Sequence, residues 1–133
     1  MKEKKTDLFD KWMKLAHDDY DMAVLASGHK KFLYAAFHLQ QSMEKALKGV
    51  IILQGDEQPP YTHDLVRLYE TIEGSSTDDR LIKFFSGLNP FYIQARYPSY
   101  REGVSSTLNQ LSIDSYLKVA QEVMAWCERK KMP

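Results

Sequence analysis

The sequence predicts an all-α fold, an up-and-down bundle of about five helices in one domain spanning residues 1–133. Apolar residues recur at three- and four-residue steps through most of the chain, whereas sustained strand-like alternation is lacking. Glycine, proline and capping residues divide the chain into segments of helical length. At 133 residues the chain has the length of one domain, and either half alone would be short of a core.

Two long helices are expected first. The first runs from Thr6 to about Ser27 and ends at Gly28, and the second runs from about Lys31 to Gln54 and ends at Gly55. In the first, the repeating apolar residues are Leu8, Trp12, Leu15, Ala16, Ala23 and Val24. In the second, they are Phe32, Ala35, Ala36, Leu39, Met43, Ala46, Leu47 and Val50.

Two short helices should follow. We expect Thr62 to cap the first of them, with Asp64 in its first turn and an end at Gly74. The run 76–79 resembles a second start signal, and Gly87 is expected to close that helix.

The segment from Leu88 to Gln110 contains two prolines and four aromatic residues and is expected to be irregular and only partly helical. A last helix is then expected to start at Ser112 or Asp114. It should reach the basic end at residues 129–131, where positive charge suits the helix dipole.

Composition excludes several classes of function. Eighteen Lys and Arg residues balance 18 Asp and Glu residues, so nucleic acid is not expected as a partner. The single Cys127 cannot form an internal disulfide, and acidic residues stand where a secretion signal would need an apolar core. The longest aliphatic run, Val50 to Leu53, is far short of the roughly 20 residues of a membrane span. A cytoplasmic protein without membrane contact is therefore expected.

The densest polar cluster lies in the second long helix. Gln40, Gln41, Glu44, Lys45 and Lys48 fall within about 140° of a helical wheel. One interpretation is a solvated face stabilised by the pairs Gln41/Lys45 and Glu44/Lys48. The other is a partner-binding face, because the apolar residues Leu33, Tyr34 and Phe37 project onto the same arc.

Two further segments could contact a ligand. His63 lies near the expected start of the third helix, where free N–H groups attract phosphate, although a histidine near a cap often has no chemical role. Tyr92 and Arg96 are four residues apart, and Pro98 places them near a helix end. Arg96 suits bidentate phosphate contact, or it could instead pair with a carboxylate and hold an irregular loop.

Four motifs together resemble a HEPN domain over nearly the full chain, in the order and at the spacing of that family. They are Ala16-x-x-Asp19-Tyr20-x-x-Ala23, Phe37-x-x-Gln40-Gln41-x-x-Glu44-Lys45-x-x-Lys48, Thr62-His63-Asp64-Leu65-x-x-Leu68 and Ala95-Arg96-Tyr97-Pro98. The resemblance implies a dimeric helical bundle, often encoded beside a minimal nucleotidyltransferase and sometimes acting in a toxin–antitoxin pair.

Many members of the family are metal-independent ribonucleases that use an arginine followed, after four to six residues, by a histidine. Here every histidine precedes every arginine, so that motif is absent. Arg96, Tyr97 and Tyr100 stand in the corresponding region, but tyrosine is a poor general base at neutral pH. Neither a phosphate loop nor zinc-ligand spacing occurs. No catalytic residue, metal site or cofactor is predicted.

Three functions remain open at this stage. The leading hypothesis is a homodimeric binding module for a nucleotide or phosphate ligand, working with a nucleotidyltransferase partner. The second is a ribonuclease toxin with a non-standard site, and the third is a purely structural dimer. The predicted ligand-binding residues are Lys45, Lys48, His63, Arg96, Tyr97 and Tyr100.

Overall fold

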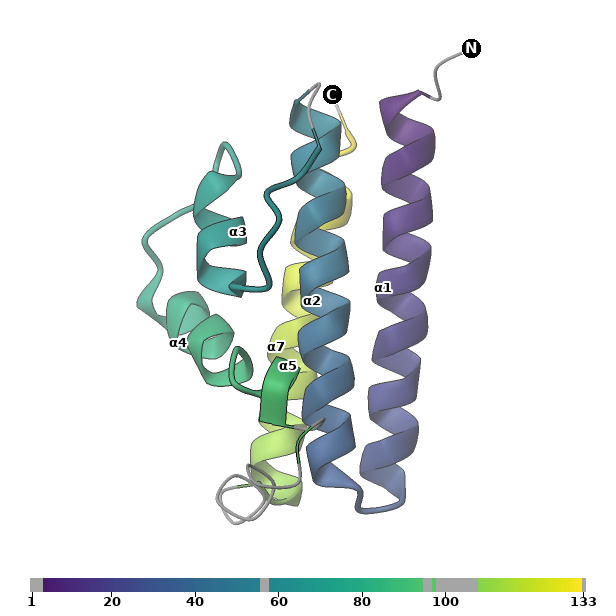
Figure 1. Ribbon diagram of the computed structural model, residues 1–133, viewed down its shortest axis with the longest axis vertical. Coiled ribbons are helices and arrows are strands. Elements are labelled where there is room, and N and C mark those ends of the chain that lie inside the picture. The colour runs from purple at the N-terminus through teal and green to yellow at the C-terminus, as the bar shows by residue number, and fades with distance from the viewer. Residues whose placement is uncertain (1–3, 56–57, 95–96, 98–107, 133) are drawn as a thin grey trace.

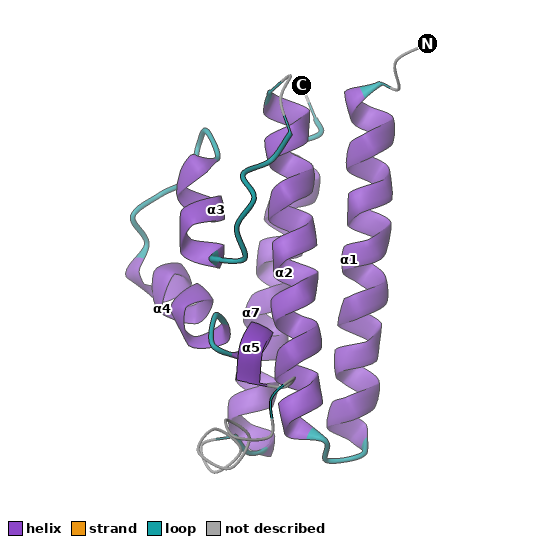
Figure 2. Ribbon diagram, viewed as in Figure 1, coloured by secondary structure: helices purple, strands orange, loops and turns teal. Residues whose placement is uncertain are grey.

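The computed structural model describes residues 4–55, 58–94, 97 and 108–132, and these residues form a helical bundle (Figures 1 and 2). Within these ranges there are five helices of seven or more residues, one single helical turn and no strand. The prediction of an all-α bundle is confirmed. The elements are α1 (Lys5–Gly28), α2 (Phe32–Gln54), α3 (Leu65–Thr71), α4 (Asp79–Leu88), the single turn α5 (Phe91–Gln94) and α7 (Gln110–Arg129).

The long helices α1 and α2 form an antiparallel hairpin along the length of the molecule (Figure 1). Their backbones approach closely at Gly49, where an added Cβ would lie 3.0 Å from Cβ of Trp12. Buried Ser42 of α2 donates a 2.8 Å hydrogen bond to the backbone oxygen of Ala16 in α1. A small residue and a satisfied hydroxyl thus fix how the two helices pack.

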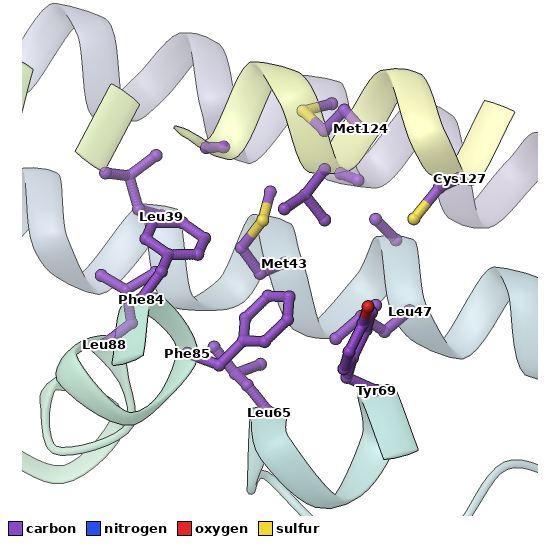
Figure 3. Close-up of a cluster of buried hydrophobic side chains, with 14 of the residues drawn as sticks. Leu39, Met43, Leu47, Leu65, Tyr69, Phe84, Phe85, Leu88, Met124 and Cys127 are labelled. Carbon is purple, nitrogen blue, oxygen red and sulfur yellow. The ribbon is translucent and has the colours of Figure 1, made fainter. Parts of the chain in front are cut away.

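The core surrounds α2 and includes buried side chains of α1, α3, α4 and α7, part of which Figure 3 shows. Leu39, Met43 and Leu47 of α2 face aromatic and aliphatic side chains from α3 and α4, while Met124 and Cys127 come from α7. Cys127 is fully buried, and burial raises the pKa of its thiol to about 12. Cys127 is therefore a packing residue of the core rather than a reactive thiol.

Two helices, α3 and α7, begin at residues other than those predicted, because a neighbouring polar residue forms the N-cap. The N-cap of α3 is Asp64 rather than Thr62, because the Asp64 carboxylate accepts from the N–H groups of Val66 and Arg67. Helix α7 begins at Gln110, earlier than predicted, because Asn109 and Ser112 form a capping box.

Gly87 does not end α4, which continues through Leu88. An added Cβ at Gly87 would lie 3.0 Å from the Tyr116 hydroxyl of α7. The glycine therefore serves close packing between two helices rather than termination.

Two residues of the apolar repeat predicted for α1 are on the surface, since Leu15 is 47% and Val24 45% exposed. Of the other four, Ala16 and Ala23 are buried and Leu8 and Trp12 are half-buried, while the buried Phe9 and Met13 were not part of the predicted repeat. None of the helices in the described ranges combines the length and apolar character that a membrane span requires.

Candidate functional site

The carboxylate of Glu44 is the centre of a hydrogen-bond network between α2 and the chain that leads into α3. Glu44 is 7% exposed and accepts hydrogen bonds from Gln40 Nε2 at 3.1 Å and Lys48 Nζ at 2.9 Å. His63 Nδ1 lies 2.9 Å from its Oε1 atom. Three donors on one buried carboxylate compensate for its removal from water.

Burial raises the pKa of Glu44, but hydrogen bonds from Lys48, His63 and Gln40 and the charge of Lys48 outweigh this effect, so the pKa is lowered from 4.5. Glu44 is therefore ionised at neutral pH and can only accept hydrogen bonds. Nδ1 of His63 must consequently carry a proton. The opposite nitrogen, Nε2, is then an acceptor on a neutral ring or a donor on a protonated one.

One aromatic ring stacks on the imidazole and a second lies near it. His63 stacks on Tyr92 of α5 with ring centroids 3.7 Å apart and planes inclined by 17°. Tyr61 lies 6.4 Å from His63 and is fully exposed. We call Gln40, Glu44, Lys48, Tyr61, His63 and Tyr92 the His63 cluster. The side chain of His63 is 40% exposed, so this cluster joins a buried carboxylate to an imidazole that solvent can reach.

A second carboxylate, Asp19 of α1, binds side chains on the part of α2 that faces α1. Asp19 of α1 accepts from Lys45 Nζ, and its Oδ1 lies 3.0 Å from Nδ1 of His38. The Asp19 side chain is only 13% exposed. Lys45, predicted to lie with Lys48 and His63, is thus bound to α1 instead, whereas Lys48 and His63 both contact Glu44.

The start of α3 is not an open anion site, contrary to one element of the prediction. Its first N–H groups are occupied, because Asp64 accepts from Val66 and Arg67 and the Asn89 side chain accepts from Leu65 at 2.8 Å. His63 can still contact a ligand through its ring, but not together with free helix N–H groups.

Three predicted ligand residues come from the segment after α5. Tyr97 is 54% exposed. Arg96 and Tyr100 lie outside the described residues, so their proximity to His63 and the choice between a ligand-binding and a structural Arg96 stay predictions.

The polar residues of α2 are not a solvated face. Gln40 is completely buried and donates to Glu44 and to the backbone oxygen of His63 at 3.2 Å, while Gln41 donates to Gln40 rather than pairing with Lys45. The predicted Glu44–Lys48 pair is present. The spacing of Gln40, Glu44 and Lys48 could have indicated a network, but nothing in the sequence linked it to His63 or Tyr92.

Beside α2, the C-terminal half of α1 carries exposed apolar side chains. Met22 and Leu25 of α1 and Tyr34 of α2 are 47%, 57% and 45% exposed and line an open depression of about 570 Å³, which His29 and His38 also line. Of the residues expected on this face, Leu33 instead packs partly against the core, and Phe37 is half-buried.

In the described part of the chain, no group of three or more His, Cys, Asp or Glu side chains has the geometry of a metal site.

The fold and the His63 cluster define a small helical domain whose polar centre lies between α2 and the approach to α3. The model of the HEPN domain family matches residues 9–130, and the chain therefore belongs to that family. Among solved structures, TT1696 from Thermus thermophilus is similar with a TM-score of 0.77 and 24% identity, over 92% of this chain and 97% of that one.

A second similar structure is ST0689, described as an archaeal HEPN homologue. It has a TM-score of 0.71 and 26% identity, over 96% of this chain and 97% of that one. No curated protein sequence matches the chain. The resemblance inferred from the four motifs is confirmed by the family match.

Proposed function

We propose that this chain is a homodimeric, cytoplasmic HEPN protein that binds a nucleotide or a related phosphate ligand through the His63 cluster and acts with a minimal nucleotidyltransferase, as a toxin–antitoxin-like pair. The observation that carries the binding role is the fixed orientation of His63, with Nδ1 bound to buried Glu44 and the ring 40% exposed. Membership of the HEPN family supports the same role.

The cluster offers the two kinds of contact that a nucleotide needs. Protonated Nε2 of His63 can donate to a phosphate oxygen, and Lys48 uses one of its donors on Glu44 and retains others. Tyr61 is fully exposed beside the imidazole and is available to stack on a base. Arg96, Tyr97 and Tyr100, predicted from the sequence, complete the proposed site, whereas Lys45 is bound to Asp19 of α1.

Dimerisation is proposed through the exposed apolar surface of α1 and α2. Met22, Leu25 and Tyr34 are each about half exposed and adjoin one depression, and apolar groups of this kind on a small protein commonly mark an interface. The partner nucleotidyltransferase rests on the family resemblance. Co-expression with a nucleotidyltransferase encoded beside the gene, followed by co-purification, tests that part of the proposal.

A ribonuclease is the second candidate function, and the Glu44–His63 pair is the observation that favours it. A carboxylate bound to Nδ1 leaves Nε2 oriented to act as a general base. The absence of the Arg-x(4–6)-His motif from the sequence weighs against this function.

Isothermal titration with ATP, AMP and adenosine tests the binding role directly. Saturable binding that weakens from ATP to adenosine is expected, since the cationic groups act on phosphate. If none of the three binds, the chain is better explained as a structural dimer. If adenosine binds as well as ATP, the proposed role of Lys48 and His63 is wrong.

A further inference from the structure

A separate cavity of about 170 Å³ lies where α3 and α4 meet α7. Its lining includes Tyr69 of α3, Arg80 and Leu81 of α4, and Glu122, Trp126 and Arg129 of α7. None of these residues belongs to the His63 cluster. Nothing in the proposed function uses this cavity.

The cavity has the size and walls of a site for one aromatic ring. An engineered protein cavity of about 150 Å³ accepts benzene, so about 170 Å³ is enough for a single six-membered ring. The wall contains two aromatic side chains, because the rings of Tyr69 and Trp126 lie 5.5 Å apart at an angle of 50°. Tilted aromatic walls suit contact with the face or the edge of a bound ring.

Fixed contacts outside the cavity hold both walls in place. The Tyr69 hydroxyl accepts from the backbone N–H of Ser76 at 3.0 Å, and Lys130 Nζ lies 4.7 Å from the centre of the Trp126 ring. A wall that is already ordered loses less conformational entropy when a ligand binds.

The rim carries more positive than negative charge. Arg80 Nη2 donates to Glu122 at 2.8 Å, which leaves other N–H groups of the guanidinium unused. Arg129 is exposed and, among the residues that the structure describes, has no carboxylate partner. Two guanidinium groups therefore face one carboxylate at the mouth of a cavity with aromatic walls.

We infer that this cavity binds a small aromatic anion, with its ring packed against the wall formed by Tyr69 and Trp126 and its carboxylate or phosphate group held by Arg129 and Arg80. Glu122 already binds part of the Arg80 guanidinium group, and its charge disfavours a second negative charge on the ligand. Arg129, which has no competing carboxylate, supplies most of the attraction for the anion.

The test follows the indole N–H signals of Trp126 and Trp12 by NMR, assigned with the Trp12→Phe variant, during titration with benzoate, phenyl phosphate and neutral benzyl alcohol. Either anion should shift the Trp126 signal saturably and leave the Trp12 signal in place. Benzyl alcohol should bind more weakly than both. The tighter of the two anions identifies the preferred acidic group.

Arg129→Gln should weaken binding of the anion about tenfold. Arg67→Gln, which removes an exposed arginine of α3 outside the cavity, is the matched control and should leave binding unchanged. The inference is overturned if neither anion shifts Trp126 up to about 10 mM. It is equally overturned if benzyl alcohol binds as well as benzoate, or if the two arginine variants behave alike.

Discussion

Nδ1 of His63 lies 2.9 Å from Oε1 of Glu44, whose side chain is 9% exposed. This contact joins the approach to α3 to the middle of α2 across 19 residues of sequence. A second histidine–glutamate contact is exposed: His17 Nε2 lies 2.6 Å from Glu128 Oε1, and both side chains are about half exposed. The two pairs allow a buried and an exposed histidine–glutamate contact to be compared within one protein.

Replacing Glu44 with Gln should lower the free energy of unfolding by about 2 kcal/mol at pH 7, because it removes the buried charge that three donors share. Glu128→Gln is the matched control and should cause a smaller loss, since exposed pairs contribute little. Urea denaturation measures both. Equal losses for the two variants would show that burial of Glu44 adds nothing to its contacts.

The effect of Glu44 should also depend on pH. Its pKa is lowered in the folded state, so its contribution to stability is present above the usual value of 4.5 and is lost as the pH falls through the folded value. The difference between wild type and Glu44→Gln should therefore be largest near neutrality and shrink in acid. Urea denaturation at a series of pH values measures it, and a difference that grows on acidification would contradict the assigned pKa.

Helix periodicity and the i,i+4 spacing of Glu44 and Lys48 were sufficient to predict the long helices and one ion pair of the site. The contacts that Glu44 and Asp19 make with residues of other segments could not be predicted. The contact of His63 with Glu44, for example, depends on the course of the chain between α2 and α3, which local sequence pattern does not determine. Local pattern also could not separate Thr62 from Asp64 as a cap. Asn89, 25 residues away, binds the Asp64 side chain and favours that choice.

Asp64→Ala should lower the free energy of unfolding by about 1 kcal/mol, because Asp64 caps α3 and also accepts from Asn89 Nδ2 at 2.8 Å. Thr62→Ala should have less effect, since the Thr62 hydroxyl accepts only a 3.2 Å bond from the Asp64 N–H. Thermal denaturation of the two variants tests the assignment. A larger loss for Thr62→Ala would restore Thr62 as the cap.

The dimer proposal predicts a particle of twice the 15.5 kDa protomer mass in light scattering. Leu25→Glu should shift the mass toward the protomer, because Leu25 is 57% exposed at the proposed interface and tolerates a charge in the folded monomer. Val24→Glu is the matched control on another side of α1, and it should leave the dimer intact. Phe37→Glu, at a half-buried position, should weaken the dimer with some loss of stability.

A wild-type mass of 15.5 kDa at all concentrations would contradict dimerisation. Equal dissociation by Leu25→Glu and Val24→Glu would place the interface elsewhere.

We expect no appreciable ribonuclease activity, because general acid–base catalysis typically supplies about 10²- to 10⁴-fold and the family's histidine is missing after Arg96. Incubation with labelled tRNA and mRNA checks this. Cleavage that survives repurification and disappears in Arg96→Ala would favour the enzyme over the binding module. Loss of that cleavage in His63→Gln would assign the general base to the Glu44–His63 pair.

The role of the His63 cluster is tested most directly by calorimetric titration of ATP into wild type, His63→Gln and His17→Gln. Both substitutions remove a histidine paired with a glutamate. Only His63 belongs to the His63 cluster, together with Tyr61, Tyr92 and Lys48. We expect His63→Gln to weaken ATP binding about tenfold, in line with the loss of a charge-assisted contact, and His17→Gln to leave it unchanged. ATP binding that is the same in all three folded proteins would contradict the proposed site.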